Sequence, residues 1–297
     1  MSSFPAAGAL GLAAGADGWW TGAWHTTTTA DGTPVMRQRT VLMEPDARPA
    51  WRRSTSDTVL FLHEGGAAVA LEEAPADGAV LGGDLFQYVV PAGVRHALVP
   101  VGSGHVLWSE AEVPGPARWE REPAPDHLPV AAPVPAAGLS AGTAERLGLT
   151  AHPEGGYYRE IYQSAGTVAT ERGPRLLANT IHYLLDSVSP VGHLHLNVSD
   201  ITHFLHAGGP IHYLTVSPDG ELHRTVLGYD VERGETPVFT CPGGWWKTSF
   251  LPDGTAEGLI SEIVAPGFDF ADQRLARVRD LAAFPAHAPL LTAYVSH

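Results

Sequence analysis

The sequence predicts an all-β protein made of two barrels in tandem, and three observations lead to this prediction. The chain of 297 residues contains 33 Gly and 25 Pro, more turn-forming residues than a helical protein tolerates. Its apolar runs are short and rich in β-branched and aromatic residues. The two halves of the chain also carry the same motifs in the same order, which indicates an internal duplication.

Four pairs of segments carry this repeat. The most similar pair is SDTVLFLHEGG at 56–66 and SDITHFLHAGG at 199–209. The other pairs are LGLAAGADGWW at 10–20 with LGLTAHPEGGYY at 147–158, VVPAGVRH at 89–96 with FTCPGGWWK at 239–247, and LWSEAEVPG at 107–115 with LISEIVAPG at 259–267. We therefore expect two equivalent units, residues 8–120 and 139–285.

The remaining segments connect or end these units. Residues 121–138 are rich in Pro and Ala, which predicts an extended linker. The run QRLARVRDLAAF, from residue 273, has apolar residues at helical spacing and predicts a short C-terminal helix. Within each unit, runs such as TIHYLLD and IHYLTV are typical of short strands, and SPDGE is typical of a hairpin turn. About eight to ten antiparallel strands per unit indicate a sandwich or a jelly-roll barrel.

Charge and composition exclude several classes of partner. The net charge of -14 disfavours nucleic acid and anionic membrane surfaces. Cys241 is the one cysteine of the chain, so an intrachain disulfide cannot form and a reducing compartment is compatible. The apolar run AAGALGLAAGA has no Lys or Arg before it, unlike a signal peptide, and no apolar run is long enough to cross a membrane. We expect a soluble, cytoplasmic protein.

Two motifs of the second unit resemble the cupins: an H-x-H pair in HLHLNVSD, and P-x-G-x-x-H, seen as PAGVRH in the first unit and PGGWWK in the second. More narrowly, HPEGGYYRE (152–160), SDITHFLHAGG, PGGWW (242–246) and VAPGFDFAD (264–272) resemble a little-characterised cupin family with HPEGGYYRE, SDEIWHFYAG, PAGWW and VAPGFDF motifs. The resemblance covers about 145–275 closely and about 8–120 in degraded form. It implies a bicupin, two double-stranded β-helix (jelly-roll) barrels in one chain, each able to enclose one small ligand.

Three histidines are candidate metal ligands. Side chains at i and i+2 of a strand share a face, so His193 and His195 are expected to point the same way, and His203 can match them from a neighbouring strand. The resemblance to cupins implies that such side chains face the barrel interior and bind a divalent transition metal, for which Fe, Mn, Ni, Cu and Zn are all suitable. The sequence departs from the cupin pattern at Ile201, which stands at the Glu position, and at Lys247, which stands at the second His position.

A metal-free site is the main alternative. Histidine is a natural proton shuttle near neutral pH, and a buried Lys has a lowered pKa. Lys247 and Tyr158 are therefore the candidate groups for proton transfer or substrate anchoring. The candidate substrate-binding residues are three aromatic side chains that suit a cyclic or aromatic substrate and one basic side chain that suits a carboxylate or phosphate: Trp245, Trp246, Phe204 and Arg159.

These residues predict a small-molecule enzyme of specialised metabolism in the second unit, either a metal-dependent isomerase, cyclase or oxygenase or a metal-free acid–base isomerase or epimerase. A non-catalytic small-molecule-binding barrel is the third hypothesis. In the first unit Arg52 and Arg53 replace the histidine pair, and their charges repel a metal cation, so this unit is expected to be structural. Two barrels in one chain mimic the usual cupin dimer, which leaves both a monomer and a homodimer open.

Overall fold

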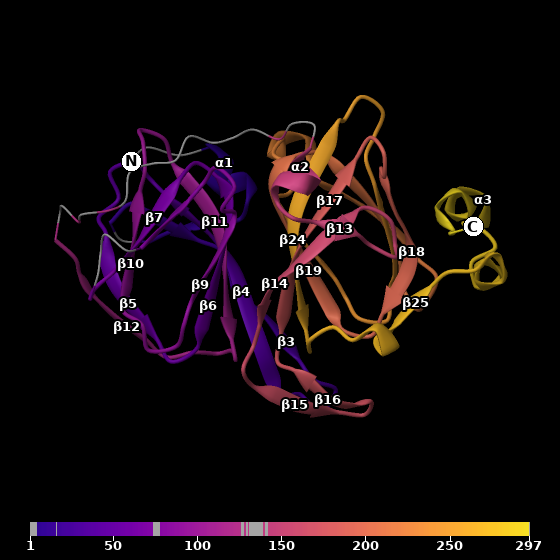
Figure 1. Ribbon diagram of the computed structural model, residues 1–297, viewed down its shortest axis with the longest axis horizontal. Coiled ribbons are helices and arrows are strands. Elements are labelled where there is room, and N and C mark those ends of the chain that lie inside the picture. Colours follow the sequence, from indigo (N-terminus) through magenta and orange to yellow (C-terminus); the bar gives the residue numbers. More distant parts are fainter. Residues whose placement is uncertain are drawn as a thin grey trace. The chain divides into compact units, whose positions relative to one another are not determined.

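The computed structural model describes residues 5–15, 17–73, 78–125, 128, 130, 139 and 142–296. The chain divides into two compact units, Met1–Gly138 (unit 1) and Leu139–His297 (unit 2). Each unit is a barrel of antiparallel strands built from two main sheets (Figure 1). The predicted all-β fold with tandem jelly-roll barrels is confirmed.

Unit 1 contains a larger and a smaller sheet. The larger sheet holds, in spatial order, β1 (Ala13–Ala14), β2 (Trp19–Thr21), β4 (Pro34–Met43), β11 (Val106–Val113), β6 (Asp57–Glu64) and β9 (Gln87–Val90), with β3 (His25–Thr28) paired to β4. The smaller sheet holds β12 (Trp119–Pro123), β5 (Ala50–Ser54), β10 (His96–Pro100), β7 (Ala67–Leu71) and β8 (Ala79–Leu81). The first residues of the segment expected to be a linker thus belong to strand β12, and most of the rest of that segment lies outside the described residues.

Unit 2 repeats the strand order of both main sheets. Its larger sheet holds β13 (Thr150–Ala151), β14 (Tyr157–Gln163), β17 (Asn179–Asp186), β24 (Glu257–Ala265), β19 (Asp200–Gly208) and β22 (Val238–Cys241). Its smaller sheet holds β21 (Leu222–Leu227), β20 (Ile211–Val216), β23 (Trp246–Phe250), β18 (Val191–Asn197) and β25 (Gln273–Leu275), and β15 (Thr167–Thr170) pairs with β16 (Gly173–Leu176) as a separate hairpin. The repeated motifs therefore occupy the same strands in both units.

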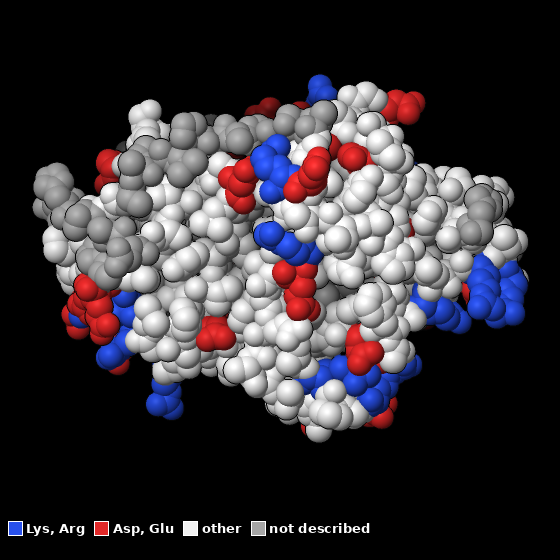
Figure 2. Space-filling model, in the orientation of Figure 1, with Lys and Arg blue, Asp and Glu red and all other residues white. Residues whose placement is uncertain are grey.

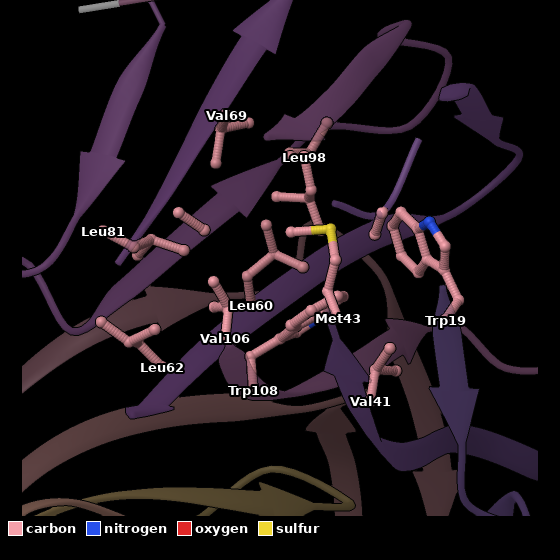
Figure 3. Packing of buried hydrophobic residues seen from close by; sticks show 13 residues of the cluster. Trp19, Val41, Met43, Leu60, Leu62, Val69, Leu81, Leu98, Val106 and Trp108 are labelled. Atoms are coloured by element: carbon pink, nitrogen blue, oxygen red, sulfur yellow. The ribbon is translucent and has the colours of Figure 1, made fainter. Parts of the chain in front are cut away.

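Large apolar side chains fill the interior of unit 1 (Figure 3). Trp19 and Trp108 meet edge to face with their ring centroids 5.5 Å apart, and Met43, Leu60 and Leu98 are fully buried around them. These residues come from strands of both sheets, so the sheets enclose one continuous core. Burial of this kind is the main driving force for folding.

The helices in the described part of the chain are short. They are α1 (Pro5–Ala9), α2 (Thr143–Arg146), α3 (Ala288–Leu291) and the 3-10 helices η2 (Val231–Arg233), η3 (Phe270–Asp272), η4 (Val278–Ala283) and η5 (Thr292–Tyr294). A short C-terminal helix is present, as predicted, but the expected start of that helix forms strand β25, because its backbone pairs with β18. None of the helices in the described part of the chain is long and apolar enough to span a membrane.

Charged residues are interspersed on the face drawn in Figure 2, where basic side chains lie beside acidic ones in small groups. Among the ion pairs of unit 2, Arg175 bonds Asp272 through two nitrogens at 2.7 and 3.1 Å. This pair ties the β15–β16 hairpin to the segment that precedes β25 in unit 2.

Candidate functional site

A cavity of about 260 Å³ opens into the barrel of unit 2, just below the roughly 300–1,000 Å³ of drug-sized ligand sites. Its walls come from both sheets and from the segments before β14 and after β24. The lining is polar on one part and apolar or aromatic on the other: His152, Glu154, Tyr158, Glu160, Asn179, Ile181, His195, Asn197, Ile201, Glu262, Val264, Phe268, Phe270 and Gln273. This mixture of apolar walls and a few convergent polar groups is typical of small-molecule sites.

A tight turn before β14 places Glu154 in the cavity wall. Gly155 follows it with φ 95°, and a Cβ at Gly155 would lie 2.2 Å from the carbonyl oxygen of Val191, so glycine is required for this close approach. The carbonyl oxygen of Glu154 accepts a hydrogen bond of 2.6 Å from the backbone N–H of His193. The turn therefore holds Glu154 against strand β18.

The Glu154 side chain is almost completely buried, with 7% of the residue exposed. Its Oε1 accepts a hydrogen bond from Gln273 Nε2 and lies 3.3 Å from His195 Nε2. The pKa of Glu154 is raised to about 8, mainly by burial and also by the charge of Glu262, although Lys247 and the Gln273 hydrogen bond act in the opposite direction. Glu154 is therefore mostly a neutral carboxylic acid at pH 7.

Three charged or ionisable side chains from three strands meet deeper in the barrel. The Lys247 ammonium on β23 donates to His203 Nε2 over 2.7 Å and lies 3.6 Å from Glu262 Oε1. His203 Nδ1 faces the carbonyl oxygen of Phe239 at 3.2 Å, so Nδ1 carries the ring hydrogen and Nε2 accepts. Glu262 Oε1 lies 3.2 Å from the same Nε2. We call Lys247, His203 and Glu262 the lysine cluster.

The lysine cluster fixes the charge states of its neighbours. Burial by itself would raise the pKa of Glu262, but the attraction of Lys247 and His203 outweighs it and lowers this pKa well below its ordinary value. Burial and then Lys247 lower the pKa of His203, and the same two causes lower the pKa of His195 to about 3. Glu262 is therefore ionised and both imidazoles are neutral at pH 7.

Two buried acceptors in the cavity wall have no hydrogen-bond partner among the described residues. His195 Nδ1 faces the carbonyl oxygen of His193 at 2.7 Å, which makes Nδ1 the donor and leaves the Nε2 lone pair free. His195 Nε2 and Asn197 Oδ1 are both buried without a partner. Because buried polar atoms are nearly always hydrogen-bonded, these atoms are places where a bound molecule can donate hydrogen bonds.

The three histidines expected to bind a metal do not form a ligand set. The β18–β23 register shifts between Gly192 and His195, and His193 is not among the residues that line the cavity. The free nitrogen of His203 is occupied by the Lys247 ammonium, which repels a metal cation. Within the described ranges, no three His, Cys, Asp or Glu side chains are placed to hold a metal ion. The donor set therefore does not fit the metal that the cupin fold implies.

The other candidate residues are divided between the cavity and the rest of unit 2. Tyr158 lines the cavity and Lys247 belongs to the lysine cluster. The four side chains predicted to contact substrate lie elsewhere: Trp246 packs into the apolar cluster beside Leu194 and Leu281, Trp245 lies against His223, Phe204 is fully buried outside the lining, and Arg159 is exposed. Strand alternation explains two of these positions, because Tyr158 and His203 face inward, so Arg159 and Phe204, one residue further along, face outward.

Glu262, Glu154 and Gln273 were not among the residues predicted from the sequence. A signal for Glu262 exists in the repeat, since LISEIVAPG aligns Glu262 with Glu110 of LWSEAEVPG. Glu110 is buried and Glu262 is largely buried, with 13% of its side chain exposed, and both contact cationic side chains. A search for charged residues shared by the two halves would have found this pair.

Comparisons with known proteins agree with this architecture. A family model described as Cupin superfamily (DUF985) matches residues 142–276. An uncharacterized protein of Saccharomyces cerevisiae is 37% identical over 146 residues, covering 44% of this chain and 72% of the yeast protein. A hypothetical protein from Leishmania major is 34% identical, with 52% of this chain and 97% of that chain covered and a TM-score of 0.49.

Across both units, a mutant oxalate decarboxylase of Bacillus subtilis matches with a TM-score of 0.52 at 10% identity, covering 95% of this chain and 80% of that chain. A likeness at this identity concerns the fold alone. The fold and the hollow second barrel define a two-barrel cupin. By its similarity to the yeast protein and to the family model, the chain belongs to the Cupin superfamily (DUF985).

Proposed function

We propose that unit 2 is a metal-free proton-transfer enzyme, of isomerase or epimerase type, that acts on a small molecule in the 260 Å³ cavity. The observation that carries this proposal is the pair of carboxyl groups in one cavity with opposite pKa shifts, Glu154 raised to about 8 and Glu262 lowered. Environments that push two carboxyl groups apart in this way are typical of acid–base sites. The metal-dependent alternative lacks a fitting donor set.

Glu154 is the proton-transfer group of this proposal. A base with a pKa near the working pH combines a useful ionised fraction with a strong affinity for the proton. Ionised Glu154 can remove the proton from a carbon next to a carbonyl group, and the resulting acid can return the proton to the other face of that carbon or to its neighbour. The reaction is balanced without an oxidant or a second substrate.

The neighbouring residues position the substrate and hold the charge. His195 Nε2, 3.3 Å from Glu154 Oε1, accepts a substrate hydroxyl hydrogen beside the reacting atom. The Lys247 ammonium and the Glu262 carboxylate form a fixed dipole next to the cavity. Such preorganised groups stabilise developing charge without reorganising during the reaction.

Solvent deuterium exchange tests this proposal. The protein is incubated in D2O with a panel of small aldoses, ketoses and hydroxy-lactones, and substrates are screened by NMR for deuterium next to the carbonyl group. We expect exchange that survives EDTA treatment and rises as pH increases through about 8, the pKa of Glu154. Glu154→Gln should reduce it by about 10²–10⁴-fold, the usual contribution of a general base.

The matched control is Glu160→Gln, which removes an exposed carboxylate from the same cavity wall and should leave exchange within about twofold, as expected of a group outside the proton-transfer step. Two results would contradict the proposal. Exchange lost with EDTA and restored by a transition metal would favour the metal-dependent alternative. Unaltered ligands that bind and never exchange would favour the non-catalytic binding barrel.

A further inference from the structure

The charges around the cavity of unit 2 indicate which molecules it can accept. The lining includes no Lys or Arg among the described residues but three glutamates. Two of these add no net negative charge, because Glu154 is largely protonated and Glu262 is paired with Lys247. The third, Glu160, is exposed and accepts a hydrogen bond from Gln163. An anion would therefore meet a carboxylate at the wall and no free cation inside.

A cationic ligand finds a carboxylate only at the exposed wall, at Glu160, and none that is free at the inner wall. Entry of a charged group into a buried site costs several kcal/mol unless a partner of opposite sign is free to receive it. The inner carboxylate, Glu262, already contacts both Lys247 and His203. The inner wall is thus close to neutral overall, which favours an uncharged ligand.

The polar atoms of the wall require hydrogen-bond donors. His195 Nε2 and Asn197 Oδ1 are buried acceptors without a partner, and Gln273 adds an amide to the same lining. Hydroxyl groups can donate hydrogen bonds to such acceptors. A ligand without hydroxyl groups would leave the acceptors unpaired, and sites of this kind therefore bind such a ligand much more weakly.

Two aromatic rings provide an apolar part of the cavity wall. Phe268 and Phe270 meet edge to face with centroids 4.9 Å apart, and Phe270 is 55% exposed although it is large and apolar. The backbone N–H of Phe268 donates to Asn179 Oδ1 over 2.8 Å, which fixes the segment to β17. The C–H face of a ring that carries hydroxyl groups on its edge would pack against this wall.

From these observations we propose that the cavity binds a neutral polyhydroxylated ring, a monosaccharide or cyclitol, and excludes phosphorylated and amino derivatives. The inference rests on the proposed function in that it names the substrate class of the same site. A volume of about 260 Å³ fits one such ring and is too small for a nucleotide sugar. Asn197 and His195 receive its hydroxyl groups, and Phe270 covers one face.

Saturation-transfer NMR and thermal unfolding of the full chain test this proposal with matched probes. D-glucose, D-galactose and myo-inositol are each compared with a phosphate monoester of the same ring, and glucose also with glucosamine. We expect at least one neutral ring to bind about tenfold or more tightly than its charged derivatives, as expected when a desolvated charge gains no partner.

Three variants locate the binding. Asn197→Leu should weaken it about tenfold or more by removing a buried acceptor, and Phe270→Ala, at an exposed position that does not affect folding, should weaken it several-fold, about the value of one stacked ring face. Arg159→Ala, on the outward face of the same barrel, is the matched control and should leave affinity unchanged.

Several outcomes would overturn the inference: no binding by any neutral ring, equal or tighter binding of a phosphate ester or of glucosamine, or binding insensitive to both Asn197→Leu and Phe270→Ala. Proton exchange on substrates outside this class would overturn the inference and leave the proposed function intact. Polyol binding without any proton exchange would overturn the proposed function and leave this inference intact.

Discussion

Both barrels bury a glutamate at the same place in the repeat and neutralise it with different side chains. In unit 1, Glu110 on β11 contacts Arg52 at 2.7 Å and Arg39 at 2.6 Å. In unit 2, Glu262 on β24 contacts Lys247 at 3.6 Å and His203 at 3.2 Å. Burial would raise the pKa of Glu110, but Arg52 and Arg39 lower it to about 2. The two barrels thus share the carboxylate and differ in the cationic side chain that pairs with it.

The cation and the imidazole have exchanged strands between the barrels. Arg52 on β5 faces His96 on β10 across the sheet, and at the corresponding positions of unit 2 His195 on β18 faces Lys247 on β23. Burial and then Arg52 lower the pKa of His96 to about 4, much as burial and Lys247 lower that of His195. At these two facing positions each barrel therefore has one cation and one neutral imidazole, on opposite strands.

The barrels also differ in what occupies their interiors. Leu60 stands in unit 1 where His203 stands in unit 2, and it belongs to the apolar cluster of Figure 3. In unit 2 the imidazole at this place binds Lys247, and a cavity lies beside it. Replacing core leucines by polar side chains requires that each new polar atom finds a partner, which the lysine cluster provides.

Exchanging the two side chains of unit 2 gives the largest expected effect. Lys247→His leaves Glu262 without a cation and should destabilise unit 2 by about 3–5 kcal/mol, the usual cost of breaking a buried ion pair. Adding His195→Arg to Lys247→His should recover at least about 2 kcal/mol, because the double variant carries its cation and its imidazole on the same strands as unit 1 does. Hydrogen exchange of β24 peptides measures the stability of this unit separately. If the double variant loses as much stability as the two single variants added together, the side-chain arrangements of units 1 and 2 are not equivalent.

The second effect is a pH dependence that unit 2 owes to Glu154. Its pKa is raised from 4.5 to about 8, so the folded state binds more protons than the unfolded state between these values. The free energy of unfolding should therefore fall as pH rises from about 4.5 to 8. Relative to Glu154→Gln, the wild type should lose about 2–4 kcal/mol between pH 5 and 9, at about 1.4 kcal/mol per pKa unit.

Urea unfolding followed by β24 hydrogen exchange across this pH range measures the difference. Glu160→Gln, which removes an exposed carboxylate, should show the same pH dependence as the wild type. If wild type and Glu154→Gln lose stability in parallel, Glu154 is ionised in the fold and the proposed base is not poised near neutral pH.

A third comparison exchanges the interior residues themselves. Leu60→His places an unpartnered imidazole in the apolar cluster of unit 1 and should cost about 2–3 kcal/mol. His203→Leu keeps the Lys247–Glu262 contact but removes the acceptor of the Lys247 ammonium, and should cost about 1–3 kcal/mol. Thermal unfolding of both variants measures these costs. A cost near zero for either variant would mean that its interior tolerates the change of polarity.

The smallest effect is expected outside the cavity. Arg159→Ala removes an exposed side chain and should change the free energy of unfolding by no more than about 0.5 kcal/mol, with unchanged deuterium exchange. Thermal unfolding and the D2O assay check both statements. Loss of exchange in this variant would place the working site on the outward face of β14.

The sequence predicted the architecture well because the repeat itself encodes it. SDTVLFLHEGG and SDITHFLHAGG form the equivalent strands β6 and β19, and their Gly pairs end both strands. Such local patterns determine which residues face inward and where a turn begins, and they are preserved in each copy.

The site was predicted less completely, for two physical reasons. The irregular register of β18 against β23 depends on pairing between strands, which a single strand does not reveal, and His193 does not line the cavity that His195 lines. The partner of Lys247 is a glutamate on a different sheet, and histidine spacing gave no indication of it. Tyr158, His195 and Lys247 were identified because strand alternation and the cupin motifs placed them inward.

The Lys247 ammonium has a consequence for how this barrel reaches its working state. Its positive charge is part of the polypeptide and is in place as soon as the chain has folded. Such a charge needs no loading step, cannot be exchanged for a competing ion, and does not change oxidation state. The cation of the second barrel is therefore present whether or not the cell takes up metal ions and whether or not it is under oxidative stress.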